Sequence, residues 1–431
     1  MAGLTVTLET AKGALLNTQV QIQTASSNIS NADSKTYARQ KAVLGTNPAM
    51  RAFGSWVGTG ANVTTIVQMR DQFIEQRLMN SISDENNYGA LSSELETIQA
   101  VFADDGTTGI SQSLGAFYDA WDQLAQNPAG TAQQTTVYQA AQNLAETIRT
   151  AYANLDAAAT DEIPGMISDT VDQANELMDE IAALNTSIVK NETPDHPAND
   201  LRDLRYKAMK ELAELVPVSF TEDSTGAVTV TTTDASGSLT LVTGGTVNNP
   251  LTTASTITGG RLGGLRTALD DVNGYIDRLN DFAGELIGNV NAIHGQGGGP
   301  AVFTGTDAET ITASTTFLSG QTPADEASRA LAMAGLQGAK ITFADGKEAT
   351  FGQYLADIQQ EIGTDAQRAA TGETYSQSLR AELETQQQAV SGVSIDEEMV
   401  DLLQFQQIYQ AAAKVIQKTA EMLNVVMDMV R

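Results

Sequence analysis

The stretch SGVSIDEEMVDLLQFQQIYQAAAKVIQKTAEMLNVVMDMV (391–430) decides the fold of this chain. Apolar side chains return every three or four residues along it, and neither Gly nor Pro interrupts residues 393–431. The pattern predicts one long helix whose two neighbouring apolar stripes are too wide for a two-stranded coil. Such a helix must be buried against several neighbours; the plainer alternative is a core helix of an ordinary helical protein. The first stripe comprises Met399, Leu402, Gln406, Tyr409, Ala413, Ile416, Ala420, Leu423, Met427 and Val430, and the second comprises Phe405, Ile408, Ala412, Val415, Thr419, Met422, Val426 and Met429.

The amino-terminal residues predict a second helix of the same kind. Its repeat stops at SNISNADSKTY (27–37), where clustered Ser, Asn and Asp break a helix. Because two such helices can pair, we expect residues 1–44 and 395–431 to form one coiled-coil assembly domain, with the rest of the chain as a large insertion. The repeat comprises Leu8, Ala11, Leu15, Thr18, Ile22, Ala25 and Ile29.

The intervening residues predict a helical body with one β-rich insertion. Helical periodicity dominates residues 45–215 and 262–394, apart from a Gly- and Thr-rich mixed segment at 295–350. Residues 216–261 alternate apolar and polar side chains around a turn at 223–226, which predicts a small outer β unit. The expected fold class is mainly α, with terminal helices in a coiled-coil domain, a long helical-bundle body and a small inserted β domain.

Charge is distributed unevenly along the chain. Residues 1–44 carry +2 and residues 395–431 carry −3, so the residues between them carry −28 of the formal net charge of −29. Near-neutral ends can pack against copies of themselves without strong repulsion, whereas an acidic body repels nucleic acid and anionic lipid. No apolar run is long enough to span a bilayer. We therefore expect no nucleic-acid partner and no membrane insertion.

No set of residues in the sequence predicts catalysis or metal binding. The chain has no Cys, which excludes disulfides and zinc-thiolate sites. His196 and His294 have no partner at metal-ligand or triad spacing. The stretches GGRLGG (259–264) and GQGGGP (295–300) lack the patterns of a dinucleotide fingerprint and a phosphate loop. We therefore expect no catalytic residue, no metal and no cofactor.

The acidic turns and pairs have structural explanations. The turns at 104–106 and 223–226 lack the alternating oxygen ligands, ending in Glu, that a calcium loop needs. Glu397 and Glu398 lie in the first turn of the carboxyl-terminal helix, where negative charge favours the helix dipole. We interpret this pair as capping residues.

The two ends resemble flagellar axial proteins. ASSNISNADSKTYARQKAVL (25–44) is similar to the amino-terminal signature of rod, hook and hook-associated proteins, and departs from it at residues 34–36. Residues 391–430 are similar to the carboxyl-terminal signature of the same proteins. The helical stretches within 70–155 and 198–297 select among them and resemble the hook-associated protein 1 family of hook–filament junction proteins. The matching amino-terminal residues are Asn28, Ile29, Asn31, Ala32, Tyr37, Arg39 and Gln40.

The resemblance implies a structural role. Terminal helices that are disordered in the monomer would pack into the axial tube, and a ring of copies would join hook to filament. The implied partners are the hook protein, the second hook-associated junction protein and a cytoplasmic export chaperone that binds the carboxyl-terminal helix. Export without a cleaved signal peptide would place the protein outside the cell, on the flagellum. The expected assembly interface comprises Leu8, Leu15, Ile22, Ile29, Met399, Leu402, Phe405, Tyr409, Ile416, Leu423 and Met427.

Three other interpretations stay open at this point. Another axial subunit (rod, hook or second junction protein) would share the ends but lack the helical block at 70–155. An enzyme, such as a peptidoglycan hydrolase carried by the flagellum, would need an acid, base or metal constellation. A secreted coiled-coil adhesin could survive the removal of residues 395–431, whereas an axial subunit could not.

Overall fold

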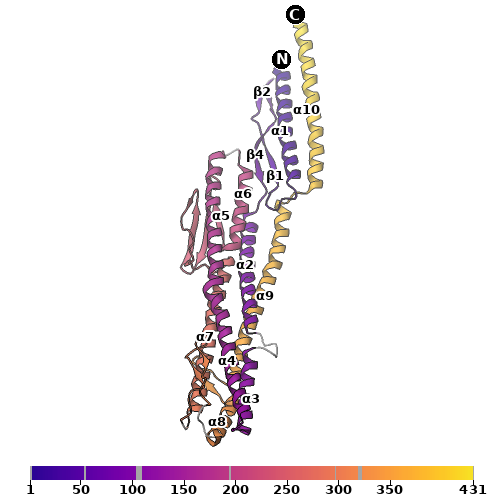
Figure 1. Cartoon of the computed structure of the whole chain (residues 1–431). Helices are drawn as coiled ribbons and strands as arrows, with labels where there is room; N and C mark the ends of the chain where they lie inside the picture. The colour runs from indigo at the N-terminus through magenta and orange to yellow at the C-terminus, as the bar shows by residue number, and fades with distance from the viewer. Residues whose placement is uncertain are drawn as a thin grey trace.

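The computed structural model describes residues 2–52, 55–102, 109–193, 196–296, 298–318 and 323–430. The molecule is elongated and mainly helical, as expected, and both termini lie at the same end (Figure 1). Two parts follow one another along its length. A terminal module carries both chain ends, and a helical body continues below it.

The terminal module is built on two antiparallel helices. The helix α1 (Ala2–Ser30) runs from the amino terminus toward the body, and α10 (Ile395–Val430) returns beside it to the carboxyl terminus (Figure 1). The two helices pack along most of their shared length. The expected pairing of the terminal helices is therefore confirmed.

Strands that follow α1 also belong to the terminal module. The strand β1 (Gln40–Thr46) pairs antiparallel with β4 (Ala61–Gln68), and both pack against α1. Between them β2 (Met50–Ala52) and β3 (Ser55–Val57) form a second, shorter antiparallel pair. A domain boundary after residue 44 would cut β1, so we propose that the terminal module extends to the end of β4.

The spine of the body is a pair of long helices. The helix α2 (Gln72–Val101) packs along α9 (Phe351–Ser391), and α7 (Gly260–Gly295) packs against α2 from another side. The shorter helices α3 (Ile110–Gln126), α6 (Asn199–Leu215) and α8 (Pro323–Gly335) complete the bundle.

A single helical run crosses the body where the sequence pattern suggested separate helices. The helix α4 (Thr131–Ala157) continues through a π-helical turn (Ala158–Glu162) into α5 (Ile163–Asn191) without a break. Pro164 sits in the first turn of α5 and has no N–H to donate. The wider π turn, in which the Ile163 N–H reaches back to the Ala158 carbonyl, lets the helix pass this proline.

The β unit packs on the side of α5 (Figure 1). It is a four-stranded antiparallel sheet in the order β5-β6-β7-β8. Residues on its inner face, among them Val230 and Leu241, are fully buried against the helices. The strands are β5 (Ser219–Glu222), β6 (Val228–Asp234), β7 (Gly237–Thr243) and β8 (Thr246–Val247).

The mixed segment (295–350) forms the end of the body farthest from the termini, beside α3 (Figure 1). It contains α8 and two short hairpins. Its aromatic residues complete a cluster in which Trp121 lies against His294 and Phe317. The hairpins are β9 (Phe303–Thr304) with β10 (Thr312–Ala313), and β11 (Ile341–Thr342) with β12 (Glu348–Ala349).

One continuous hydrophobic core runs through the body, and it stops at the terminal module. The core contains residues from α2 through α9 and the β unit, but none from α1 or α10 among the described residues. The module's own buried apolar residues are small, such as Ala11, Ala25 and Ala412. Within one chain, the stability of the module therefore depends on a helix–helix contact that buries few large apolar side chains.

Candidate assembly interface

The contact between α1 and α10 is made by small side chains. Ala11, Thr18 and Ala25 are buried on α1, and Ala412 and Thr419 are buried on α10. The two threonines satisfy their hydroxyls within their own helices, Thr18 on the Ala14 carbonyl at 2.6 Å and Thr419 on the Val415 carbonyl at 2.8 Å. Small residues let the two helix backbones approach closely, but they bury little apolar area.

The predicted α1 residues lie beside this contact and not at its centre. All four predicted positions are half-buried, while Leu16 between them is exposed. They therefore share the face toward α10 but keep part of their surface open. These residues are Leu8, Leu15, Ile22 and Ile29.

The predicted α10 residues divide into two groups. Leu402, Phe405, Ile416 and Leu423 are half-buried against α1. Tyr409 is exposed at the same seam, and Met399 and Met427 are exposed to one side of it. Four of the seven predicted α10 positions are thus partly covered within the single chain.

The seam on α10 runs between the two predicted stripes. It takes alternate positions from each stripe and leaves the other half of each stripe on its flanks. One flank consists of Ile408, Val415, Met422 and Met429, all exposed. The other flank begins with Met399 and ends with Met427. One partner helix cannot cover a face this wide, so both flanks are unpartnered in the single chain.

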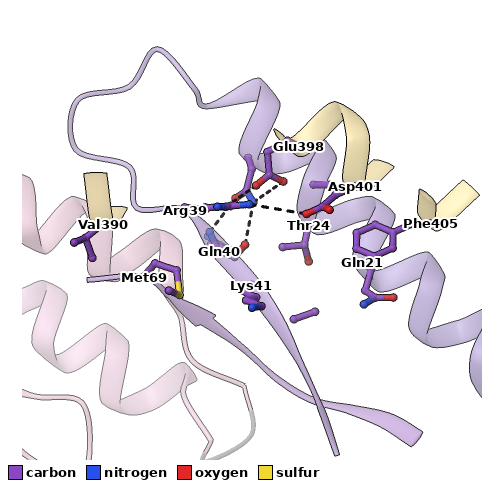
Figure 2. A pocket seen from close by; sticks show the side chains of 13 residues that line it. Gln21, Thr24, Arg39, Gln40, Lys41, Met69, Val390, Glu398, Asp401 and Phe405 are labelled. Atoms are coloured by element: carbon purple, nitrogen blue, oxygen red, sulfur yellow. Dashed lines mark hydrogen bonds and ion pairs between the residues drawn. The ribbon is translucent and has the colours of Figure 1, made fainter. Parts of the chain in front are cut away.

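A polar joint fixes the base of the helix pair (Figure 2). Asn28, near the end of α1, donates from Nδ2 to the Gln40 carbonyl at 2.9 Å and to Glu398 Oε2 at 3.1 Å. Arg39 Nε donates to Glu398 Oε1 at 2.7 Å. Figure 2 shows the Arg39 guanidinium between Glu398 and Asp401, whose Oδ2 lies 3.9 Å from an Arg39 nitrogen. The joint therefore ties α1, β1 and α10 through one buried carboxylate.

The interpretation of Glu398 as a capping residue is wrong. The residue is only 3% exposed, and its carboxylate binds Arg39 and Asn28 across the joint. Ser394 performs the capping: its Oγ accepts from the Glu397 N–H at 3.4 Å, and its carbonyl accepts from the Glu398 N–H at 3.0 Å. Sequence spacing could not reveal this, because Arg39 is brought to Glu398 only by the pairing of the chain ends.

The backbone of Arg39 joins the module to the body. Its N–H donates to the Ser391 carbonyl at the end of α9, and its carbonyl accepts from the Met69 N–H, both at 2.8 Å. Three segments distant in sequence thus meet at one residue.

A second arginine anchors the joint in the body. Arg70 donates to Asp203 Oδ1 at 2.7 Å, to Glu75 Oε1 at 3.1 Å and to the Thr36 carbonyl at 2.7 Å. Its guanidinium lies 4.0 Å from the ring centroid of Tyr206, a cation–π contact. The loop after α1 is therefore held to α2 and α6 by a single side chain.

Burial shapes the electrostatics of this anchor. Desolvation raises the pKa of Asp203, and the hydrogen bond from Arg70 opposes the rise. Desolvation, together with the charge of Glu75, also raises the pKa of Tyr206, whose hydroxyl accepts from Gln387 at 2.8 Å. The tyrosine is thus a neutral hydrogen-bonding group, and the anchor is structural in character.

Sequence reasoning missed this anchor. The sequence pattern assigns no role to Arg70, Glu75, Asp203 or Gln387. A usable signal was present, since Glu75 and Gln387 lie on the inward faces of α2 and α9 and are buried. A charged residue at an apolar position of a helix requires a partner.

The groups considered for chemistry have structural roles where the structure describes them. His294 is buried, its Nδ1 lies 2.7 Å from the Pro300 carbonyl, and its Nε2 lies 3.7 Å from Glu326 Oε1. His196 is exposed in a loop and bridges to Thr193. In the described parts of the chain, no group of His, Asp or Glu side chains could hold a metal ion.

The acidic turn at 223–226 is a hydrogen-bonded hairpin turn. The Asp223 carboxylate accepts from the N–H and the hydroxyl of Thr225 and from the Ala227 N–H. All three bonds go to Oδ1, and they lower the pKa of Asp223. The other acidic turn, at 104–106, lies outside the described residues. None of the described helices is both long and apolar enough to cross a membrane.

Comparison with known families agrees with this geometry. Residues 95–256 match the model of the flagellar hook-associated protein FlgK helical domain. Residues 386–429, which include α10 and its joint, match the carboxyl-terminal model of the flagellar basal body rod FlgEFG proteins. The helical block and the terminal helix are thus recognised separately.

A comparison over the whole chain covers both matched regions in one relative. The chain is 24% identical to flagellar hook-associated protein 1 of Bacillus subtilis (strain 168), over 98% of this chain and 97% of that protein. The chain belongs to the flagellar hook-associated protein 1 family. Its members are structural components of the flagellum and not enzymes.

Other members of the hook-associated protein 1 family match over a smaller part of this chain and of their own length. The proteins of Salmonella typhimurium and Escherichia coli (strain K12) are 25% and 24% identical, and the alignments span 38% and 41% of their lengths. The solved structure of the flagellar hook junction protein FlgK from Burkholderia pseudomallei has a TM-score of 0.47 and 20% identity, over 64% of this chain and 57% of that one.

Proposed function

We propose that this hook-associated protein joins hook to filament by packing its terminal module into the axial tube of the flagellum. One observation carries the proposal: α10 presents exposed apolar side chains on both flanks of its contact with α1. Uncovered apolar stripes of this kind mark interaction surfaces in soluble proteins. Neighbouring copies of the terminal module would cover them.

The separation of the module from the core supports the same proposal. Because α1 and α10 contribute nothing to the core of the body, the module can be rebuilt in an assembly without unfolding the rest. Its near-neutral charge also allows dense packing, in contrast to the acidic body. The body would then lie outside the tube, where its charge stays solvated.

The partners follow from this arrangement as proposals. The hook protein would lie on one side of a ring of copies and the second hook-associated junction protein on the other. Before export, a cytoplasmic chaperone would cover α10, because its exposed methionines and aliphatic residues would otherwise promote aggregation. The working location is the extracellular flagellum.

Binding to isolated hooks tests the proposed function. The full chain and a version lacking residues 395–431 are each labelled, added to hooks stripped of filaments, and counted at hook tips by electron microscopy. We expect tip binding by the full chain alone, because the truncated chain lacks the exposed flanks. Equal binding by both versions would refute the role of α10.

A pair of point variants sharpens the assay. Ile416→Asp places a charge in the half-buried seam, and Gln417→Asp places the same charge on the next, exposed residue. We expect the first to abolish tip binding with the circular dichroism of the body retained, and the second to bind normally. Normal binding by Ile416→Asp would refute the packing of α10 into the wall of the axial tube.

A further inference from the structure

The hairpin formed by β2 and β3 presents an unpartnered apolar surface. Trp56 is 72% exposed and lies on the same face of the hairpin as Arg51, the residue paired with it across the strands. Met50, which is 47% exposed, lies on the other face, because successive residues of a strand point to opposite sides. Exposed tryptophan is costly in a free subunit and is enriched at the centre of protein interfaces. No contact inside the chain accounts for this side chain among the described residues.

The hairpin and the free flanks of α10 lie on opposite sides of α1. The strands β1 and β4, which carry the hairpin, pack on α1, and α10 packs on α1 from the other side (Figure 1). Two different apolar surfaces on opposite sides of one module can meet only between copies. Such a contact is heterologous, the kind that closes into rings or helical tubes.

The two surfaces also lie at the same height along the module. The bond between Asn28 and Glu398 fixes the register of the antiparallel helices. Gly60, which follows the hairpin, packs against Thr10, eighteen residues before Asn28. The same step beyond Glu398 reaches Ile416, since both helices rise about 1.5 Å per residue. The hairpin therefore faces the level at which Val415 and Met422 are exposed.

The hairpin carries a basic side chain, and the α10 surface carries acids that can form ion pairs with it. Residues 34–70 contain five basic residues and neither Asp nor Glu, in a chain with a net charge of −29. Arg51 on β2 is exposed and forms no ion pair within the described part of the chain. The back of α10 at this level carries the exposed acids Glu421 and Asp428, and Glu421 also forms an exposed ion pair with Lys418 at 2.7 Å. A neighbouring copy would bring these acids to Arg51.

We propose that the β2–β3 hairpin of one copy docks on the α10 flank of the next copy, with Trp56 packed against Met422 and Arg51 facing Glu421. The proposal rests on the proposed assembly of copies and specifies which surfaces meet. In this arrangement the hairpin makes the side-to-side contact between neighbouring copies in the ring, whereas the α1–α10 pair forms the wall of the axial tube.

Disulfide trapping tests the pairing directly, since the chain contains no Cys. Gly58→Cys lies two residues after Trp56, on the same side of the chain, and an added Cβ there meets no atom within 4 Å. It is combined with Met422→Cys in the full chain, copies are bound to stripped hooks, and a mild oxidant is added. A disulfide forms only where the Cβ atoms approach within about 4.5 Å. We expect a ladder of covalent multimers on a denaturing gel. The matched control combines Gly58→Cys with Met427→Cys, which is 63% exposed on the other flank, and should give monomers.

A second variant measures the contribution of the tryptophan. Trp56→Ser should reduce the number of labelled copies per hook tip about tenfold, as expected for loss of an interface anchor. The control Tyr375→Ser removes an aromatic ring of similar exposure from α9 and should bind normally.

The outcomes separate this proposal from the proposed function. Tip binding without a ladder at Met422, or with a ladder at Met427, would overturn the hairpin pairing and leave the axial role standing. Absence of tip binding by the unmodified full chain would overturn both. Capture of the hook protein by the Gly58→Cys position would assign the hairpin to that partner and refute the contact between copies.

Discussion

Glu397 and Glu398 are identical neighbours in sequence with different roles in the structure. The side chain of Glu397 is 67% exposed and reaches Arg39 at 3.2 Å, whereas Glu398 is buried and binds both Arg39 and Asn28. A surface ion pair contributes little because water screens it. A buried carboxylate with charged and amide donors contributes more, since its loss leaves those donors without a partner.

Replacing Glu398 by Gln should loosen the joint. The amide would keep the shape but lose the charge that holds Arg39, at a cost of about 1–2 kcal/mol. The backbone N–H groups of Arg39 and Met69, which bridge the segments there, should then exchange with solvent roughly tenfold faster. Hydrogen-exchange mass spectrometry of residues 36–70 measures this. Glu397→Gln is the control and should leave exchange nearly unchanged; equal effects of both variants would contradict the assigned roles.

At the scale of elements, periodicity predicted the long helices but not their rotation about their own axes. The sequence shows both apolar stripes of α10. The contact with α1, however, uses half of the residues of each stripe, because packing against α1 decides how α10 is rotated about its own axis. The run from α4 to α5 shows the same limit. A proline signals a helix boundary locally, but neighbouring helices stabilised the continuous run through a π turn.

Close crossing of α2 and α7 depends on a glycine. A Cβ on Gly264 would lie 2.2 Å from the Asn87 carbonyl oxygen. Because this oxygen belongs to the backbone of α2, one of the two helices would have to move to relieve the contact. Gly274, further along α7, has open space around its position. The close approach of the two helices at this crossing therefore requires the absence of a side chain at Gly264.

Gly264→Ala should destabilise the body by about 1–3 kcal/mol, the usual cost of overpacking. Gly274→Ala should instead stabilise it by up to about 1 kcal/mol, because Ala is the better helix former where space allows. Urea unfolding monitored by circular dichroism measures both free energies of unfolding. A similar change for the two variants would show that the crossing is looser than the structure indicates.

In the whole molecule, the acidic charge and the proposed assembly surface lie in different parts. The acidic residues gather on the body, and some of them repel one another across the bundle. Asp271 on α7 is the clearest case: burial, followed by the charges of Asp365, Asp270 and Glu361, raises its pKa to about 6. The terminal module carries little net charge, so self-repulsion acts mainly on the body.

Acidification should stabilise the body in a defined window. The folded pKa of Asp271 lies above the ordinary value of 3.8, so the folded state binds more protons between about pH 4 and pH 6. Stability due to this residue therefore falls as pH rises through that window and stays low above it.

Asp271→Asn should raise Tm at pH 7.5, by less than about 4 °C because the residue is half-buried and partly screened. The gain should vanish at pH 4. Calorimetry at both pH values measures this, with the exposed Asp119→Asn on α3 as the control. A gain that is equal at both pH values would rule out the charge repulsion as its cause.

The sequence by itself determined the mainly helical fold, the two long terminal helices and the resemblance to the flagellar family, because periodicity and local signatures are properties of neighbouring residues. It also determined the uneven charge and the lack of cysteine. Only the tertiary structure decided that Asn28, Arg39 and Glu398 form one joint, that the seam on α10 runs between its stripes, and that Trp56 stands exposed opposite the free flank. These facts depend on contacts between residues hundreds of positions apart, which are selected by packing of the whole chain and not by any local pattern.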